Sequence, residues 1–327
     1  MRKGTVAATE MATGWGLRTF TRDALDKIHA ATLDVLRSTG VSIDCDEALD
    51  ILNKGGCWTN KKTRVVRFPD HIVTQALSLC PSHILLAGRN PDNDFMMGGK
   101  QVGFTTFGVG VLTEDLETGE IRESTKEDVE KIARLTDALT HMDILTAPVA
   151  ARDKPDSSYD LHMLEAALTY CSKHYASDSE DGERTKKLIE MAAAVAGGID
   201  ALKQRPIVSF GICPTSPLQI IKSSAEVVIQ AAKHWLPINV LSMVLAGASS
   251  PISISGALVT HNAEVLAGII LAQLTNPGTP VIYGSSSTTL DMTYGTAVVG
   301  VPEMAMISAA AADLANYYGL PSYVAGG

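Results

Sequence analysis

Residues 238–285 read INVLSMVLAGASSPISISGALVTHNAEVLAGIILAQLTNPGTPVIYGS, and this stretch decides the fold. Residues 238–243 and 280–285 are short apolar runs that contain β-branched residues, a composition typical of buried strands. Between them, residues 255–275 form a long apolar segment that predicts a helix. Two buried strands joined by a helix predict a parallel βαβ unit.

The same alternation extends in both directions along the chain. Strands are expected at 102–112, 144–149, 173–178, 207–213, 238–243, 280–285 and 322–326. Helices are expected at 125–139, 157–171, 181–197, 217–234, 255–275 and 302–318. Strands that alternate with helices at this spacing predict a parallel sheet with helices packed outside it.

Two architectures satisfy this pattern, the doubly wound sheet and the (β/α)₈ TIM barrel. A dinucleotide-binding doubly wound sheet needs a GxGxxG turn, whereas Gly108-Val109-Gly110 lacks the third glycine and lies inside an expected strand. A phosphate-binding P-loop is excluded because Gly99-Lys100 is followed by Gln101. A complete barrel takes typically ~250 residues and eight strands. We therefore predict an incomplete barrel of about seven strands at 101–327, which is the catalytic domain with its C-terminal part missing.

Residues 1–100 have a different pattern and predict a small N-terminal α/β cap. A loose leader covers 1–20, and an amphipathic helix follows at 21–37 with Thr21 as its N-cap. A short strand, a second helix, a hairpin near 60–61 and a third helix that opens at Pro69 complete the cap.

The charge and the cysteines limit the partners and the compartment. The chain carries 27 Lys and Arg residues against 36 Asp and Glu residues, a net charge of −9, and it has no basic patch for a nucleic acid. Its five cysteines are scattered and form no CxxC pair, as expected for reduced thiols in the cytoplasm. We expect no signal peptide, because the N-terminus leads into no continuous apolar stretch. We expect no membrane span, because the apolar segments near 263–274 and 304–315 are shorter than ~20 residues.

In a barrel, the catalytic residues lie at the carboxyl ends of the strands. Polar residues expected there include Arg152, Asp178 and the serine run 285–287. Glu264 also stands out, because a carboxylate early in an apolar helix is costly unless it faces a polar environment. His162 and His261 each precede a glutamate by three residues, but zinc needs three or four converging ligands, so we expect no metal site.

Several strings, in the right order, resemble the trimethylamine methyltransferase family, and the resemblance runs from about residue 20 to the end. They are PTSPL at 214–218, PINVLSM at 237–243, LVTHNAEVL at 258–266, YGSS at 283–286 and GLPS at 319–322. The family implies a (β/α)₈ barrel that passes a methyl group from trimethylamine to the cobalt(I) of a corrinoid protein, in methylamine catabolism and methanogenesis.

The resemblance also implies the parts of the reaction. One branch of the family uses pyrrolysine, encoded by an in-frame UAG codon, which is expected directly after Gly327. The corrinoid is carried by the cognate partner protein, so no cofactor is expected on this chain. The pocket residues expected from the sequence are Glu264 and Asp291 as catalytic carboxylates. Phe107, Tyr283, Ser285 and Tyr323 are the expected substrate-binding residues. A homo-oligomer is expected.

Three other interpretations stay open at this point. The chain could be a pyrrolysine-free methyltransferase for quaternary amines such as glycine betaine. It could be an inactive truncated fragment, or an unrelated barrel lyase or isomerase. The codon after Gly327 distinguishes these interpretations.

Overall fold

The computed structural model describes residues 12–13 and 18–326. The chain divides into two compact units. The central unit comprises Met1–Gly14 and Leu85–Phe210, and the terminal unit comprises Trp15–Ile84 and Gly211–Gly327. In this grouping residues 15–84 belong to the same unit as the last third of the chain, and a cap at 1–100 followed by a catalytic domain at 101–327 stays a prediction.

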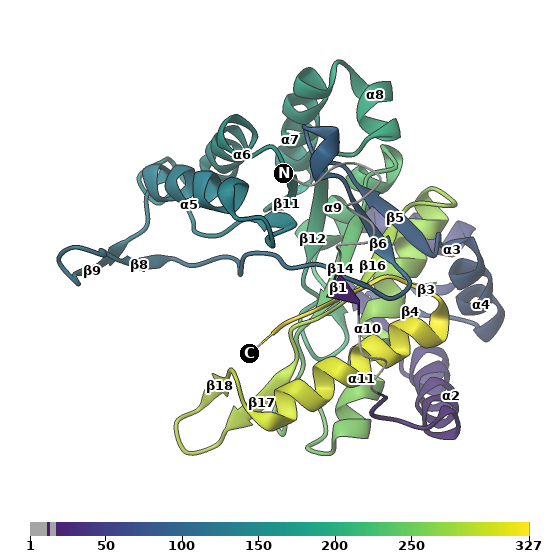
Figure 1. Cartoon of the computed structure of the whole chain (residues 1–327). Helices are drawn as coiled ribbons and strands as arrows, with labels where there is room; N and C mark the ends of the chain where they lie inside the picture. The colour runs from purple at the N-terminus through teal and green to yellow at the C-terminus, as the bar shows by residue number, and fades with distance from the viewer. Residues whose placement is uncertain (1–11, 14–17, 327) are drawn as a thin grey trace. The chain divides into compact units, whose positions relative to one another are not determined.

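Three parallel strands form the sheet of the terminal unit (Figure 1). In this sheet β16 lies between the other two strands, with Val240 opposite Tyr283 and Gly284 opposite Tyr323. The predicted strands 238–243, 280–285 and 322–326 are confirmed to within two residues. The strands are β14 (Ile238–Ser242), β16 (Val281–Ser285) and β19 (Ser322–Val324), and the helices are α9 (Lys222–Lys233), α10 (Ile254–Thr275) and α11 (Pro302–Tyr318).

The N-terminal segment of the terminal unit contains both helices and strands. Thr21 caps its first helix by accepting a hydrogen bond from the amide of Ala24 at 3.3 Å. Its three strands form a four-stranded sheet together with β13, which comes from the C-terminal segment of the unit, in the order β13-β2-β4-β3. The elements are α2 (Arg22–Ser38), β2 (Val41–Ile43), α3 (Asp46–Lys54), β3 (Trp58–Asn60), β4 (Val65–Arg67), α4 (Asp70–Leu79) and β13 (Gln219–Ile220).

Helix α10 is the core of the terminal unit. It packs against α2, α4, α9 and β14, and almost every side chain from Ala257 to Gln273 is buried. Its 22 residues are long and apolar enough to cross a membrane by length and composition, yet 72% of the apolar window is buried inside the protein. Burial by neighbouring elements accounts for its apolar composition, as expected for a core helix.

The central unit carries parallel strands β10, β11 and the start of β12, with helices between them. The register pairs Leu145 with Tyr175, and the amide of Tyr175 donates to the carbonyl of Ile207 at 3.1 Å. The predicted strands 144–149, 173–178 and 207–213 are therefore confirmed, although β10 is shorter. The elements are α5 (Lys126–Ala138), β10 (Ile144–Thr146), α6 (Tyr159–Tyr170), β11 (His174–Asp178), α7 (Gly182–Ala196), α8 (Ile199–Gln204) and β12 (Val208–Ile212).

Both units also contain short strands that form small separate sheets. In the central unit β1 pairs with β7 and β8 pairs with β9, and in the terminal unit β15, β17 and β18 form a small sheet. The bounds are β1 (Ala12–Thr13), β5 (His83–Leu86), β6 (Phe95–Gly98), β7 (Gln101–Val102), β8 (Leu112–Glu114), β9 (Ile121–Glu123), β15 (Leu245–Ala246), β17 (Thr288–Asp291) and β18 (Thr296–Val298). A 3₁₀ turn, η1, covers Pro91–Asn93.

The predicted strand at 102–112 is wrong. Residues 103–110 run alongside residues 144–149 without forming a regular strand. Two isolated parallel bridges join the segments, Thr105 to Ile144 and Gly110 to Val149. The hydroxyl of Thr106 occupies the place of a ladder partner, since it donates to the carbonyl of Thr146 at 2.7 Å and accepts from its amide at 3.0 Å. Among the described residues, six of the seven predicted barrel strands are thus regular, and the count of seven is not confirmed.

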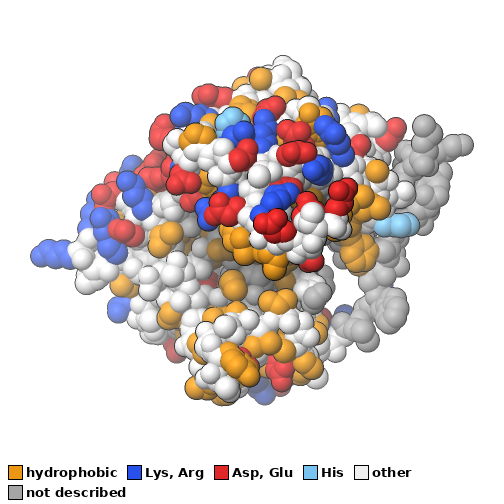
Figure 2. Space-filling view, turned by 90° about the vertical axis from the view of Figure 1, so that its left-hand side faces the viewer, with side chains coloured by type: hydrophobic (Ala, Val, Ile, Leu, Met, Phe, Trp, Pro, Cys, Tyr) orange, Lys and Arg blue, Asp and Glu red, His pale blue; other side chains and the backbone are white. Residues whose placement is uncertain are grey.

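On the face shown in Figure 2, lysines and arginines are interspersed with aspartates and glutamates. That face shows no continuous basic patch of the kind that attracts a polyanion.

Candidate active site

Glu264 is fully buried on α10 and is enclosed by three hydrogen-bond donors. Its Oε1 accepts from the amide of Leu218 at 2.9 Å, and its Oε2 accepts from the hydroxyls of Ser216 at 2.8 Å and Ser242 at 2.7 Å. Burial raises the pKa of Glu264, and the three donors partly oppose this. Because Ser216 and Leu218 follow β12 while Ser242 ends β14, the carboxylate ties a loop to the carboxyl end of the sheet.

A buried polar network continues from Ser242 to His261. The carbonyl of Ser242 accepts from the amide of Ser286 at 3.0 Å and from the hydroxyl of Ser287 at 3.2 Å. The Ser287 hydroxyl lies 3.3 Å from Nδ1 of His261. Burial lowers the pKa of His261 to about 3, so its ring is neutral, and its Nε2 has no hydrogen-bond partner among the described residues. The network is a polar layer between α10 and the strand ends.

This network lies on the helix-facing side of the sheet. A Cβ built on Gly268 of α10 would lie 2.7 Å from Cγ1 of Val240, so Val240 faces α10, and Ser242 faces the same way because side chains alternate along a strand. The hydroxyl of Tyr283, opposite Val240 in the sheet, donates to Oδ1 of Asn262 on α10 at 2.9 Å.

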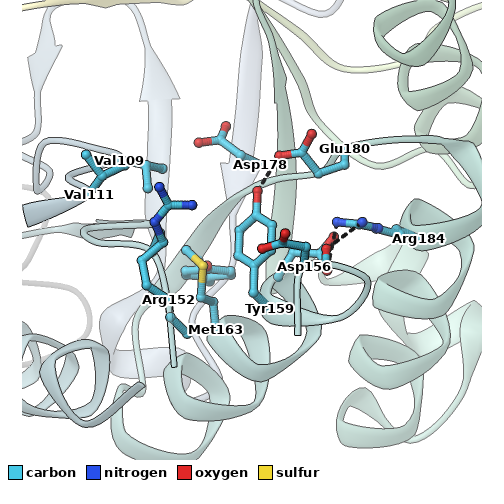
Figure 3. Close-up of a pocket in the computed structure, with 13 residues that line it drawn as sticks. Val109, Val111, Arg152, Asp156, Tyr159, Met163, Asp178, Glu180 and Arg184 are labelled. Carbon is cyan, nitrogen blue, oxygen red and sulfur yellow. Dashed lines mark hydrogen bonds and ion pairs between the residues drawn. The ribbon is translucent and has the colours of Figure 1, made fainter. Parts of the chain in front are cut away.

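A pocket of about 530 Å³ lies in the central unit, where β11 ends and α6 and α7 begin (Figure 3). The hydroxyl of Tyr159, in the first turn of α6, donates to the carboxylate of Glu180. Arg184 on α7 places Nη1 3.8 Å from Oδ1 of Asp160, and its Nη2 donates to the carbonyl of Asp156 at 2.6 Å. Ion pairs and hydrogen bonds therefore fix one wall of the pocket.

The electrostatics of this pocket are dominated by carboxylates. The Asp160 side chain is only 3% exposed, and its Oδ2 has no hydrogen-bond partner within the described part of the chain. Burial raises the pKa of Asp160 although Arg184 opposes the shift. Partial desolvation, and secondarily the nearby charge of Glu180, raise the pKa of Asp178, although this residue is exposed to solvent. The Nη1 atom of Arg184 is likewise buried without a hydrogen-bond partner in the described part of the chain, so this pocket holds unpartnered polar atoms of both signs.

Comparison with known proteins identifies the family. The sequence profile of the trimethylamine methyltransferase (MTTB) family matches residues 11–327. The chain belongs to the trimethylamine methyltransferase family. It is 48% identical over 327 residues to trimethylamine methyltransferase MttB of Desulfitobacterium hafniense, and the match covers 100% of this chain and 66% of that protein. It is 42% identical over 330 residues to MttB of Methanosarcina barkeri, covering 99% and 67%.

More distant relatives define the range of similarity. The glycine betaine methyltransferase of Desulfitobacterium hafniense is 34% identical over 308 residues, with 94% of this chain and 64% of that protein covered. The crystal structure of the Methanosarcina barkeri monomethylamine methyltransferase (MtmB) matches with a TM-score of 0.55 at 14% identity, covering 98% of this chain and 72% of the other. The chain thus shares the MtmB fold and spans about two thirds of the length of its curated relatives.

In this trimethylamine methyltransferase family chain, the sequence-predicted site residues are dispersed. Glu264 and Ser285 lie near each other through Ser242, since Ser285 pairs with Ser242 in the sheet. Asp291 instead shapes the turn between β17 and β18, where its Oδ1 accepts from the amides of Thr293 at 2.7 Å and Tyr294 at 3.2 Å. None of the three lines the 530 Å³ pocket.

The predicted aromatic residues are also separated. Tyr283 is fully buried beside α10, whereas Tyr323 lies opposite Gly284 in the next strand and is partly exposed. Phe107 belongs to the central unit, where 72% of its surface is exposed. These three rings do not form one aromatic box around a ligand within the terminal unit.

Sequence reasoning missed the residues that define the pocket of this family member. Arg152 and Asp178 were expected at the carboxyl ends of strands and do line the pocket. Tyr159, Asp160 and Arg184 were missed because they lie in the first turns of helices. The available signal was the density of acidic residues in two consecutive strand-to-helix connections, 153–160 and 178–183. Among the described residues, no group of three His, Cys, Asp or Glu side chains could hold a metal ion.

Proposed function

We propose that this chain is part of an enzyme that transfers a methyl group from trimethylamine to the cobalt(I) of a corrinoid protein, in methylamine catabolism or methanogenesis. Family membership carries the proposal. Identity to two trimethylamine methyltransferases is 48% and 42%, against 34% to the glycine betaine methyltransferase. The proposal includes a (β/α)₈ barrel, a cytoplasmic homo-oligomer, and no metal or cofactor resident on this chain.

The chemistry requires the amine to become a better leaving group. If trimethylamine itself gave up a methyl group, the leaving group would be a dimethylamide anion, which is a poor leaving group. If the nitrogen first gains a fourth substituent, the leaving group is a neutral amine. The family resemblance assigns this activation to pyrrolysine, and we place it directly after Gly327. In support, the amide of Ala325 donates to the carbonyl of Ser285 at 2.9 Å, so the chain leaves β19 beside the carboxyl end of β16. The corrinoid of the partner protein supplies a nucleophilic cobalt(I) when it is bound.

The residues of this chain hold the loop after β12 and the end of β14 in place and provide a polar environment there. Glu264 fixes the loop after β12 through Ser216 and Leu218, and it fixes the end of β14 through Ser242. We therefore propose Glu264 as a positioning residue for this end of the sheet. Alignment of reacting groups by such rigid contacts is worth up to ~7–11 kcal/mol of barrier in favourable cases.

The complete gene product and the 1–327 polypeptide test this proposal side by side. The codon after Gly327 is read, the complete protein is produced with pyrrolysine inserted if that codon is UAG, and both forms are assayed with a cobalt(I) corrinoid protein. We expect trimethylamine to methylate the corrinoid with the complete protein and not with residues 1–327. Turnover of glycine betaine alone, or equal activity of the 1–327 polypeptide, would refute the proposal.

A further inference from the structure

The hairpin formed by β8 and β9, here called the arm (residues 112–123), has one face that is turned to solvent. The register places Leu112 opposite Glu123 and Glu114 opposite Ile121, so these four side chains share one face of the hairpin. All four are exposed, and the tip of the arm extends past α5 in Figure 1. A two-stranded hairpin is at best marginally stable without further packing, so a contact on this outer face stabilises the arm.

The inner face and the turn of the arm are held within the central unit itself. Arg122, on the inner face, is paired with Asp128 at the start of α5 at 2.7 Å. Asp115 shapes the turn, where its Oδ1 accepts from the amide of Glu117 at 3.1 Å. This turn leaves Leu116 fully exposed at the tip of the arm. The arm therefore has a fixed inner face, while its outer face and its tip present apolar side chains to solvent.

The arm is also acidic. Residues 112–123 contain five carboxylates against one arginine, and that arginine is already paired. Glu114, Glu117, Glu120 and Glu123 form no ion pair among the described residues. A surface that covers the arm must therefore offer positive charge as well as apolar area.

An exposed surface of the terminal unit has the complementary properties. Trp58 of β3 lies opposite Arg67 of β4, and the two side chains line a hollow of about 440 Å³. The Trp58 side chain is 63% exposed, and Arg67 forms no ion pair within the part of the chain that the structure describes. Apart from Arg67, the described residues that line the hollow are uncharged. The hollow thus combines an aromatic wall with a free guanidinium group.

The hairpin of β3 and β4 is basic as a whole. Residues 58–67 contain four lysines and arginines and no carboxylate. Lys61 and Arg64 are paired with nearby aspartates, whereas Lys62 and Arg67 have no ion pair among the described residues. In addition, β3 is the end strand of its sheet, so one of its edges pairs with no described strand. Such an edge is open to pairing with another chain.

We propose that the outer face of the arm docks on the β3–β4 surface of a second copy of this chain. Carboxylates of the arm face Lys62 and Arg67, and Leu116 enters the hollow against Trp58. Both surfaces are exposed in the structure, which favours a second copy over docking within one chain. Because the contact joins two different surfaces, it is heterologous and builds a ring or a row of copies. The inference rests on the homo-oligomer of the proposed function and adds the surfaces that form it.

Charge reversal on each surface of the complete protein tests this contact. The arm variant carries Glu114→Lys and Glu123→Lys, and the surface variant carries Lys62→Glu and Arg67→Glu. We expect each variant to raise the dissociation constant of self-association by about tenfold or more, because like charges then meet across the contact. Sedimentation velocity at a series of protein concentrations measures the constant, and thermal unfolding confirms that each variant is folded.

A mixture of the two variants distinguishes docking between copies from docking within one chain. The basic arm of the arm variant meets the acidic surface of the surface variant. The unaltered acidic arm of the surface variant meets the unaltered basic surface of the arm variant. We therefore expect the mixture to associate about as strongly as the parent at the same total concentration. If both variants dissociate and their mixture does not reassemble, the proposal is overturned.

Matched controls separate specific docking from total charge and total hydrophobicity. Glu183→Lys combined with Asp200→Lys changes the net charge as much as the arm variant does, at two exposed positions of the same unit. We expect this control to shift the dissociation constant by less than about twofold, since it lies outside both surfaces. Leu116→Ser should weaken association about fivefold or more by removing the apolar tip. Met292→Ser, at an exposed turn of another hairpin, should leave association unchanged.

These measurements use no corrinoid protein, so their outcome is independent of methyl transfer. Loss of association in both variants and its recovery in the mixture support the contact even if trimethylamine is not a substrate. A complete protein that stays monomeric, or parental association of both variants, overturns the contact even if methyl transfer occurs. Parental self-association together with weaker binding of a corrinoid protein by the arm variant also overturns it and assigns the arm to that partner.

Discussion

At the scale of single residues, Glu264 combines burial with complete hydrogen bonding, and this predicts a specific dependence of stability on pH. Burial raises the pKa of Glu264 above the ordinary value of 4.5. The folded state therefore holds the proton more tightly than the unfolded chain, and stability from this group is fully present below pH 4.5. It is lost as the pH rises through the higher folded pKa, with a slope of at most about 1.4 kcal/mol per pH unit.

Glu264→Gln isolates this effect, because the glutamine does not titrate. Its carbonyl can still accept from Leu218, and its amide can donate to the hydroxyls of Ser216 and Ser242, so the variant should fold. We expect the wild-type chain to lose stability relative to Glu264→Gln between pH 4 and pH 7, as measured by urea unfolding. A difference that stays constant with pH would show that the Glu264 carboxylate is not desolvated. In the complete enzyme, we expect the same variant to lower methyl transfer at least tenfold, because hydrogen bonds to a carboxylate hold Ser216, Leu218 and Ser242 more strongly than hydrogen bonds to a neutral amide.

The sequence predicts some of these residues and not others for physical reasons. Glu264 is recognisable because a carboxylate inside an apolar helix needs polar partners, and it has three. Asp291 lies in a similar polar run, yet its carboxylate is used by backbone amides of a turn, which sequence spacing does not distinguish from a pocket carboxylate. The burial of Asp160 could not be predicted from the sequence in this way, because it depends on the contact of α6 with α7.

At the scale of elements, the contact between α10 and β14 depends on a glycine. A Cβ on Gly268 would lie 2.7 Å and 3.0 Å from the two γ carbons of Val240. We expect Gly268→Ala to destabilise the protein by about 1–3 kcal/mol through overpacking, although alanine favours a helix by ~1 kcal/mol. Denaturant unfolding measures the loss.

A double-mutant cycle shows whether Val240 is the cause. Val240→Ala alone should destabilise by leaving a cavity, while the combined Gly268→Ala and Val240→Ala protein should lose less than the sum of the two single variants. Additive losses would mean that the added methyl group is accommodated elsewhere.

Strands could be predicted from the sequence where an apolar run is also buried and paired in the structure. The apolar run that became β16 pairs with β14 on one side and with β19 on the other and is buried throughout, so its pattern is decisive. Residues 103–110 include Phe104, Phe107 and Val109 but also contain three glycines. A Cβ at Gly108 would lie 2.3 Å from the carbonyl oxygen of Ala147, a close approach that breaks the regular ladder. A pattern of residue types does not report such distances between segments.

At the scale of the whole molecule, the terminal unit is built from two segments that are far apart in the sequence. Helix α10 packs against α2, α3 and α4. The amide of Asn262 on α10 donates to Thr32 on α2 at 3.0 Å in a buried position, and the His29 ring lies 3.0 Å from the hydroxyl of Tyr318. The first hundred residues therefore provide part of the core around α10.

This arrangement predicts that the expected catalytic domain does not fold by itself. A polypeptide of residues 101–327 keeps every predicted barrel strand but lacks α2, α3 and α4, so the apolar side of α10 that they bury becomes exposed. Exposed apolar surface of this extent promotes association. We expect residues 101–327 to be aggregated or to unfold without a cooperative transition, whereas the parent 1–327 chain serves as the matched control. Addition of a separate 1–100 polypeptide during refolding should recover soluble protein, because it restores the missing surface of the core. A soluble 101–327 polypeptide with a cooperative thermal transition like that of the parent would instead establish a domain boundary at residue 100.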